Sequence, residues 1–378
     1  MKLPLEGLKV LDLSRQLPGP YCSMLLADMG ADVLVIASPT DPMGMGMSVL
    51  ARNKRSLTLN LKAPEGREIF QRLAREADVV LEGFRPGVVE RLGVDFERLR
   101  KDNRRLIYCS LSGYGQTGPY RDLVGHDVNY LGYAGVVGLT GNPAGPALAG
   151  VQIADVGGGA LMAAVGILTA VIGREKTGEG QLVDVSMLDG SVAWNAFHWL
   201  VYFSSGQVPR RGETTLTGAT PSYAIYECKD GKYLTIGALE GHFWKALCEQ
   251  LGAPEYVARQ FPSAEEREAV FGFFRARFKE RTRDEWLAAL AGVDICVGPV
   301  NDLAETERDP QVRAREMIVE IDTPSGRQKT LGVPIKLSAT PGSVRTPPPA
   351  FGQHTEEVLT GLGYSGADVA RLRAARTV

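Results

Sequence analysis

Residues 9–36, KVLDLSRQLPGPYCSMLLADMGADVLVI, decide the fold of this chain. Residues 9–13 are a short apolar strand candidate, Pro18-Gly19-Pro20 ends it, and residues 21–28 have the pattern of a helix that stops before Gly30. Residues 31–36 are a second strand candidate. A strand, a helix and a strand at this length predict a βαβ unit and therefore a parallel sheet.

The same alternation continues along the chain. The further predicted elements are helices at 65–77 and 87–92, strands at 78–82, 106–111 and 181–186, and helices at 157–173 and 187–203. Residues 157–173 are almost entirely apolar or glycine, and a helix that is apolar all round is expected to be buried. The N-terminal part is therefore predicted to be an α/β domain of Rossmann-like type.

A polar linker near Val208-Pro209-Arg210-Arg211-Gly212 marks a change of organisation. The Lys229-Asp230-Gly231 turn between two apolar runs predicts a β-hairpin, and amphipathic helical patterns follow over 241–292. We expect a large Rossmann-like domain at 1–207 and a smaller α+β domain with its linkers at 208–330. The C-terminal segment 331–378, with a short helix at 355–361, is expected to return to the large domain.

Composition narrows the class of protein. The 378 residues are 44% hydrophobic and 23% charged, with a net charge of -2, as in ordinary soluble globular proteins without a bias towards nucleic acid or anionic membranes. No signal peptide or long uninterrupted apolar run is evident, so a cytoplasmic location is expected. Five cysteines without a C-x-x-C pair and four scattered histidines predict neither disulfides nor a metal site.

The richest chemical signal is Gly125-His126-Asp127 together with Asp155. An imidazole and a carboxylate on opposite sides of a carbon acid can remove a proton from one face and return it to the other. Other interpretations remain open at this point: His126 can be structural, and Asp155 can be a helix N-cap whose helix start also binds an anion. Glu240 is a surface carboxylate or the group that fixes the tautomer of His126.

Three further motifs have two interpretations each. Residues 113–118 fit G-x-G-x-x-G, but no clear helix follows, which favours a turn-rich active-site loop over a dinucleotide fingerprint. Arg52-Asn53-Lys54-Arg55, with Lys62, Arg85 and Arg91, is either a solvated surface or a phosphate-binding set. The methionine-rich residues 43–47 are either a loop without a role or an adaptable surface for an acyl chain.

Taken together, these segments resemble family III CoA transferases and, within them, α-methylacyl-CoA racemases. The resemblance covers nearly the whole chain. It is carried by the segments LEGLKVLD (5–12), RNKRSLTLNLK (52–62), FRPG (84–87), GYGQTGPY (113–120), GHDVNY (125–130), DVSMLDG (184–190), GALE (237–240), DICVGPV (294–300) and GQHT (352–355). Asp155 matches the aspartate shared by the superfamily, whereas His126 and Glu240 match the racemase branch.

The resemblance implies a function and a set of site residues. It implies that His126 and Asp155 are catalytic, that Glu240 supports His126, and that two chains form an interlocked homodimer. It also implies that the CoA part of the substrate contacts a set of residues on the large domain, with no separate cofactor and no metal. This set is Arg52, Lys54, Arg55, Leu59, Lys62, Gly83, Arg85, Arg91, Gly125, Asp127 and Tyr130.

One position departs from the family pattern. Relatives usually carry an arginine before the proline that follows the second strand, and that arginine meets the CoA phosphates. This chain has Ala37-Ser38-Pro39 there, so Arg52, Lys54 or Arg55 would have to compensate for the missing cation at Ser38.

The predicted function is epimerisation of 2-methylacyl-CoA thioesters by 1,1-proton transfer. The first alternative is a CoA transferase that uses Asp155 as its nucleophile, and the second is an acyl-CoA-binding protein with weak or no catalysis. Sterol side chains, branched fatty acids and aryl-propionyl groups all remain possible acyl chains.

Overall fold

The computed structural model describes residues 2–41 and 48–378, so the methionine-rich run at 43–47 lies outside the described residues. The chain divides into two compact units, which are described separately. The first unit comprises Met1–Ala134, Gly150–Ala196 and Pro310–Val378, and the second comprises Gly135–Ala149 and Phe197–Asp309.

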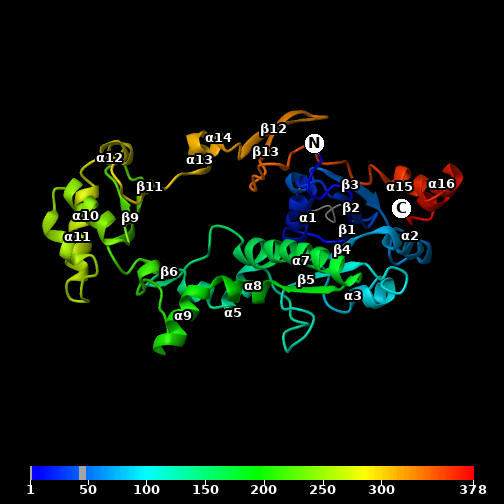
Figure 1. Ribbon diagram of the computed structural model, residues 1–378, viewed down its shortest axis with the longest axis horizontal. Coiled ribbons are helices and arrows are strands. Elements are labelled where there is room, and N and C mark those ends of the chain that lie inside the picture. The colour runs from blue at the N-terminus through cyan, green and yellow to red at the C-terminus, as the bar shows by residue number, and fades with distance from the viewer. Residues whose placement is uncertain (1, 42–47) are drawn as a thin grey trace. The chain divides into compact units, whose positions relative to one another are not determined.

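The first unit is built on a parallel sheet of six strands in the order β3-β2-β1-β4-β5-β8 (Figure 1). The strands are β1 (Lys9–Asp12), β2 (Asp32–Ala37), β3 (Lys54–Thr58), β4 (Val79–Glu82), β5 (Ile107–Ser112) and β8 (Leu182–Ser186). Every neighbouring pair of these strands is parallel, which confirms the predicted sheet. The sequence reading missed β3, because its first residues Lys54 and Arg55 belong to a run of cations that was interpreted only as a surface or a ligand site.

Helices complete this unit. They are α1 (Pro18–Asp28), α2 (Pro64–Glu76), α3 (Val88–Leu92), α4 (Phe96–Leu99), α5 (Asp127–Tyr133), α7 (Met162–Thr177), α8 (Met187–Trp194), α14 (Pro310–Ala314), α15 (Thr355–Gly361) and α16 (Gly366–Ala374), with the 3-10 turn η2 (Ser48–Leu50) and the π-helix η3 (Ile153–Leu161). The C-terminal helices α15 and α16 lie beside β3 and α2 (Figure 1). Their Leu359 and Leu372 are fully buried in the core that also contains Leu57 and Phe70. The C-terminal segment thus completes the core of the unit that begins the chain.

The order of the strands identifies a binding position. From β1 the chain proceeds through β2 to β3 on one side, and then returns to β4 and β5 on the other side of β1. The reversal therefore falls between β1 and β4. In open parallel sheets, ligands bind outside the carboxyl ends of the strands at such a switch point. The segments that follow Asp12 and Glu82 are expected to line a site.

The apolar helix is less buried than its sequence predicts. The continuous helix of residues 153–177 has a mean hydropathy of 2.0 over its most apolar 18-residue window, of which 44% is buried. Val165 and Ile172 are 60% and 63% exposed. The prediction of all-round burial is wrong for the single chain, because this helix packs on β5 and β8 with one face and leaves the other open. By length and composition alone the helix could cross a membrane, a property that core helices of soluble proteins share.

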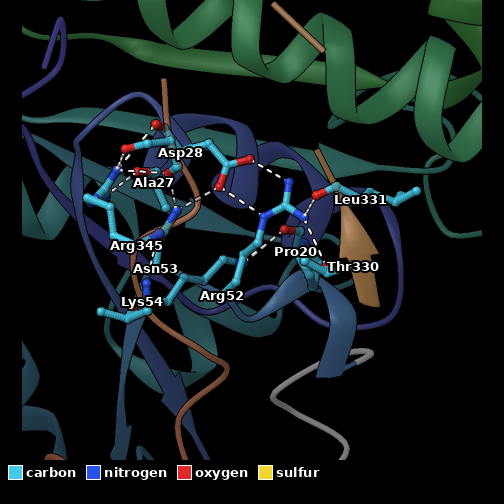
Figure 2. A network of polar contacts seen from close by, with 11 residues as sticks. Pro20, Ala27, Asp28, Arg52, Asn53, Lys54, Thr330, Leu331 and Arg345 are labelled. Atoms are coloured by element: carbon cyan, nitrogen blue, oxygen red, sulfur yellow. Dashed lines mark hydrogen bonds and ion pairs between the residues drawn. The ribbon is translucent and has the colours of Figure 1, made fainter. Parts of the chain in front are cut away.

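A network of buried polar contacts joins the end of α1 and the start of β3 to three residues late in the chain, Thr330, Leu331 and Arg345 (Figure 2). The Arg52 guanidinium donates to both carboxylate oxygens of Asp28, at 2.7 and 3.1 Å, and also to Thr330 and Leu331. Asn53 donates to Asp28 at 2.8 Å, and Arg345 donates to the carbonyl of Ala27 at 2.7 Å. Arg52 and Asp28 are 1% and 0% exposed in their side chains, so this pair is a structural element of the unit.

The second unit has a three-stranded antiparallel sheet and its own core. The strands are β9 (Tyr223–Glu227), β10 (Tyr233–Gly237) and β11 (Val297–Pro299), and the β9–β10 pair confirms the predicted hairpin. The other elements are α6 (Val136–Leu139), β6 (Gly141–Asn142), β7 (Gly145–Pro146), α9 (Ala196–Ser205), η4 (Thr215–Thr217), α10 (Gly241–Gln250), η5 (Pro254–Arg259), α11 (Arg267–Phe278), α12 (Arg283–Leu290) and α13 (Leu303–Arg308). Trp244, Phe274 and Phe278 are fully buried at the centre of this core.

The units divide the chain at other positions than the predicted domains 1–207, 208–330 and 331–378. Residues 135–149 join the second unit, where Arg211 donates to the carbonyls of Asn142 and Gly138. The hairpin of β12 (Ile318–Thr323) and β13 (Gly326–Leu331) joins the first unit, where Arg52 binds Thr330 and Leu331. Both differences come from side-chain contacts between segments that are distant in sequence.

Candidate active site

A cavity of about 1010 Å³ opens at the switch point of the sheet. Its walls are residues 15–19 after β1, residues 83–86 after β4, and residues 111–114 at the end of β5. Further wall residues lie around the start of α5, at positions 121, 123–126, 129 and 130, together with Gln152, Asp155 and Met187. His126 and Asp155, the two predicted proton carriers, both line this cavity.

Asp155 is held by an unusual helix. It is the third residue of the π-helix η3, and this helix packs closely against α8 through glycine. A Cβ on Gly158 would lie 2.7 Å from the carbonyl oxygen of Met187, and one on Gly190 would lie 2.1 Å from that of Gly158. Only glycine allows such a contact, so the glycine run fixes where η3, and hence Asp155, lies.

The interpretation of Asp155 as a helix N-cap is wrong, because Gln152 occupies that position and Asp155 lies inside the helix. The Asp155 amide also has a partner: it donates to Oδ1 of Asp127 at 3.0 Å. The next amide, that of Val156, donates to the carbonyl of Gln152. These two N–H groups are therefore not free to bind an anion. The sequence had predicted an anion site at this helix start.

The surroundings of Asp155 favour its neutral form. Burial, followed by repulsion from Asp127, raises the pKa of Asp155 from 3.8 to about 6, and the nearby His126 opposes this rise. A carboxyl group with a pKa near neutrality can both accept and return a proton under physiological conditions. Strongly shifted groups in a cavity are typical of functional sites.

The loop that begins α5 positions both predicted proton carriers. His126 directly precedes α5, and its amide donates to Oδ1 of Asn129 at 3.0 Å. Asp127, the first residue of α5, accepts the hydrogen bond from the Asp155 amide. The side chains of Asn129 and Asp127, in one short segment, thus hold the backbone at His126 and at Asp155.

Tyr130 forms part of the wall next to these groups. Its hydroxyl donates to the carbonyl of Gly125 at 2.6 Å, and a Cβ on Gly125 or Gly113 would lie 2.8 or 2.5 Å from its ring. Burial and the charge of Asp155 raise the pKa of Tyr130 to about 12, so the phenol stays protonated. The two glycines are therefore needed to seat this ring.

The structure brings some of the predicted site residues together and not others. His126 and Asp155 share the cavity wall with Gly83, Arg85, Gly125 and Tyr130. Asp127 reaches the site through the Asp155 amide. Glu240, which directly precedes α10, belongs to the second unit, and its support of His126 stays a prediction.

The remaining predicted CoA contacts do not line the described cavity. They are Arg52, Lys54, Arg55, Leu59, Lys62 and Arg91. Arg52 is bound to Asp28, and Lys54 donates to Ser23 and to the carbonyl of Pro20, while both side chains are 1% exposed. A phosphate could reach these two cations only if their present contacts were broken. Arg55 is more accessible, but it pairs with Asp32 and Glu357.

The sequence reading also missed several cavity residues. Arg15, Gln16 and Leu17 follow β1, and Arg121 precedes the His126 loop. The available signal was their position after a parallel strand, where ligands usually bind, but Pro18-Gly19-Pro20 was taken only as the end of the strand. Residues 113–118 behave as predicted: Gly113 and Tyr114 line the cavity, and the next helix begins only at Asp127.

Within residues 2–41 and 48–378, no cluster of three or more His, Cys, Asp or Glu side chains could hold a metal ion. The imidazole of His126 and the carboxyl group of Asp155 in the cavity wall can transfer protons, and Asp155 can also act as a nucleophile. The strand order and the cavity at the switch point, with His126 and Asp155 in its wall, define an α/β protein with a candidate active site at the carboxyl ends of its sheet.

Comparison with known proteins identifies the family. The sequence profile of CoA-transferase family III matches residues 5–355, and the chain belongs to this family. It is 35% identical over 380 residues to α-methylacyl-CoA racemase from Homo sapiens, covering 100% of this chain and 98% of the relative. It is also 34% identical to succinyl-CoA–D-citramalate CoA-transferase from Chloroflexus aurantiacus, covering 99% of this chain and 98% of the relative.

The fold agrees with this assignment. The crystal structure of a CAIB/BAIF family protein from Brucella suis matches with a TM-score of 0.83 at 32% identity, covering 96% of this chain and 100% of that one. The chain is therefore an enzyme of the family III CoA-transferase and racemase type.

Proposed function

We propose that this enzyme epimerises 2-methylacyl-CoA thioesters at the α-carbon by 1,1-proton transfer through an enolate. The observation that carries the proposal is the placement of His126 and Asp155 in the wall of one cavity, with the pKa of Asp155 raised to about 6. Two relatives of about this length, from human and mouse, are α-methylacyl-CoA racemases at 35% and 36% identity.

In the proposed mechanism each group serves one epimer. His126 removes the α-proton of one epimer, and protonated Asp155 returns a proton to the opposite face. In the reverse direction ionised Asp155 is the base and the imidazolium of His126 is the acid. Two different groups are required, because a single base would return the proton to the face from which it came.

Proton transfer alone does not account for such a reaction. General acid–base catalysis typically contributes about 10²–10⁴-fold, so the enolate oxygen must be stabilised electrostatically as well. The Asp155 and Val156 amides already have acceptors, whereas the cavity wall contains Arg15, Arg85 and Arg121. We infer that this positive potential favours the enolate, and no further cofactor is needed for the proposed step.

A CoA-transferase reaction is the second candidate, and the relatives support it directly. Proteins that match this chain at 34% identity include succinate–glutarate and acetyl-CoA–oxalate CoA-transferases. In that reaction Asp155 would attack the thioester as a nucleophile. His126 would then have no proton to remove from the α-carbon.

Solvent exchange separates the two candidates. We expect the enzyme in deuterated water to incorporate deuterium at the α-carbon of a 2-methylacyl-CoA without any acceptor acid, as detected by NMR or mass spectrometry. Transfer of CoA to an added carboxylic acid without α-exchange would instead establish the transferase. Binding of the thioester without either reaction would leave the acyl-CoA-binding alternative.

We further propose that the enzyme acts as a homodimer, in which the partner's second unit brings Glu240 to His126. Two features support this arrangement. Val165 and Ile172 leave an apolar face of α7 exposed in the single chain, and Glu240 lies in the other compact unit from His126. The molar mass in solution, measured by light scattering, tests the dimer, and a monomer with full activity would contradict it. We also propose that the enzyme is located in the cytoplasm.

A further inference from the structure

An arginine outside the predicted set of CoA contacts also lines the cavity. Arg15 follows β1 and lines the cavity together with Gln16 and Leu17. Gln16 has a left-handed backbone with φ of 65°. Residues other than glycine rarely adopt this conformation, and such strain clusters at ligand-binding sites.

The guanidinium of Arg15 is held against the cavity wall. It lies 5.3 Å from the centre of the Phe84 ring, and Phe84 belongs to the segment after β4, the strand that pairs with β1. This contact orients the planar group while leaving the Arg15 side chain 41% exposed. Arg15 and Arg85 therefore approach the cavity from neighbouring strand ends.

The described partner of Arg15 is a carboxylate that can be exchanged. Arg15 Nη1 lies 2.7 Å from Oδ2 of Asp41, and the Asp41 side chain is 31% exposed. Partly exposed ion pairs of this kind contribute little to stability, so a ligand anion can replace Asp41 at small cost. The pair also shows that a carboxylate fits beside Arg15 without rearrangement of the loop.

The balance of charges indicates that the cavity is built for an anion. The described residues that line the cavity include three arginines, Arg15, Arg85 and Arg121, and a single carboxylate, Asp155. The raised pKa of Asp155 favours its neutral form. Arg121 is already engaged by Asp122 and the carbonyl of Gln116. Arg15 is therefore placed to bind a second anion of the ligand besides the one that Arg85 can take.

We propose that Arg15 forms an anion subsite of the catalytic cavity, which binds a carboxylate or phosphate group of the thioester substrate in exchange for Asp41. This inference rests on the proposed thioester substrate. A carboxylate would come from the far end of the acyl chain and would make dicarboxylic thioesters preferred substrates. A phosphate would come from the CoA part and would make Arg15 a further contact for that part.

Four ligands distinguish these sources: the 2-methylglutaryl and 2-methylpentanoyl thioesters of CoA, and the same two thioesters of pantetheine, which lacks the CoA phosphates. Their Kd values are measured by titration calorimetry for the wild type, Arg15→Gln and Asp41→Asn. Loss of a charged hydrogen bond is expected to raise Kd about tenfold or more. If only the two methylglutaryl ligands lose affinity in Arg15→Gln, the anion is the acyl carboxylate. If only the two CoA ligands do, it is a phosphate.

Asp41→Asn should act in the opposite direction and lower Kd for the same ligands, because it frees Arg15. Arg104→Gln is the matched control, since Arg104 forms an exposed ion pair with Glu179 outside this cavity. The proposal is overturned if Arg15→Gln leaves all four Kd values unchanged or raises all four equally. It is also overturned if Asp41→Asn leaves them unchanged or weakens binding. Because Kd is measured with racemic thioesters, whose composition epimerisation does not change, wild-type enzyme that exchanges no α-deuterium would refute the proposed reaction and leave this test valid.

Discussion

Two groups of charged side chains in the first unit differ in how their charges are partnered. Asp28 and Arg52 are completely buried and satisfy each other with two hydrogen bonds (Figure 2). His126 and Asp155 instead line an open cavity, and the neighbour that contacts the Asp155 backbone is another carboxylate. Removing one partner of a fully paired buried charge destabilises a fold, whereas a charge next to one of the same sign has a shifted pKa, as functional groups often do.

The largest effect is expected when either of the two proposed proton carriers is removed. We expect His126→Ala and Asp155→Asn each to lower the rate of epimerisation by about 10²–10⁴-fold, because one of the two bases is lost. Each variant should still exchange the α-proton of the single epimer that its remaining base serves. NMR of each pure epimer in deuterated water measures both rates. Asp102→Asn, which removes an exposed carboxylate paired with Arg75, is the control and should behave as wild type.

Epimerisation at the wild-type rate in either variant would show that the proposed two-base mechanism is wrong. Loss of exchange from both epimers in a single variant would contradict the assignment of one base to each epimer.

Substitution of the buried Arg52–Asp28 pair should lower the stability of the protein rather than its catalytic rate. Arg52→Ala leaves Asp28 buried without its ion-pair partner and should lower the free energy of unfolding by about 3–5 kcal/mol. Arg55→Ala removes a pair of which the side chains are 34% and 45% exposed. It should cost less than about 1 kcal/mol. Urea unfolding followed by circular dichroism measures both.

The same variants test the predicted CoA contact. Folded Arg52→Ala should bind a CoA thioester with unchanged Kd, because its guanidinium is occupied inside the protein. Weaker CoA binding at unchanged stability would instead support the role predicted from the sequence.

These residues show why the sequence predicts some features and not others. The βαβ pattern in residues 9–36 predicts the parallel sheet, because apolar strands and their turn residues are local signals. Arg52, Lys54 and Arg55 form one cationic run in the sequence. In the structure Arg52 and Lys54 are buried among separate partners and Arg55 is paired at the surface. Those partners lie 24 or more residues away for Arg52, so no local pattern reveals them.

The site was predictable to a similar extent. His126 and Asp155 are chemically distinctive residue types, and the cavity contains both. Arg15 has no local motif and reaches the cavity only because β1 and β4 are neighbours in the sheet. The π-helix around Asp155 was not predicted either. It packs closely against α8, and this contact requires Gly158 to meet Gly190, which belongs to another segment.

Asp155 should cost the protein stability, in contrast to Asp28. Its pKa is raised from 3.8 to about 6, so its ionised form is less favourable in the folded chain than in the unfolded one. The folded state therefore loses stability as the pH rises from about 4 to about 6. At neutral pH, Asp155→Asn should gain about 1–2 kcal/mol, after allowance for the partial exposure of the carboxylate. Thermal unfolding at about pH 4 and pH 8 measures the difference, which should appear only at the higher pH. A less stable variant at pH 8 would contradict the assignment of Asp155 as a strained, functional carboxylate.

The smallest effect concerns Asp127, whose charge is the second cause of the raised pKa of Asp155, after burial. Asp127→Asn keeps an oxygen that can accept the hydrogen bond from the Asp155 amide and removes only the charge. The pKa of Asp155 should fall, and the acidic limb of kcat/KM should move to lower pH for the epimer from which Asp155 removes the proton. The other epimer requires protonated Asp155 as acid, so its kcat should decline at a lower pH than in the wild type. The predicted role of Asp127 as a CoA contact would instead raise KM at every pH and leave both profiles in place. A shift of the pH profile at constant KM therefore shows that the carboxylates of the cavity act on each other, as the fully paired charges of the buried network do not.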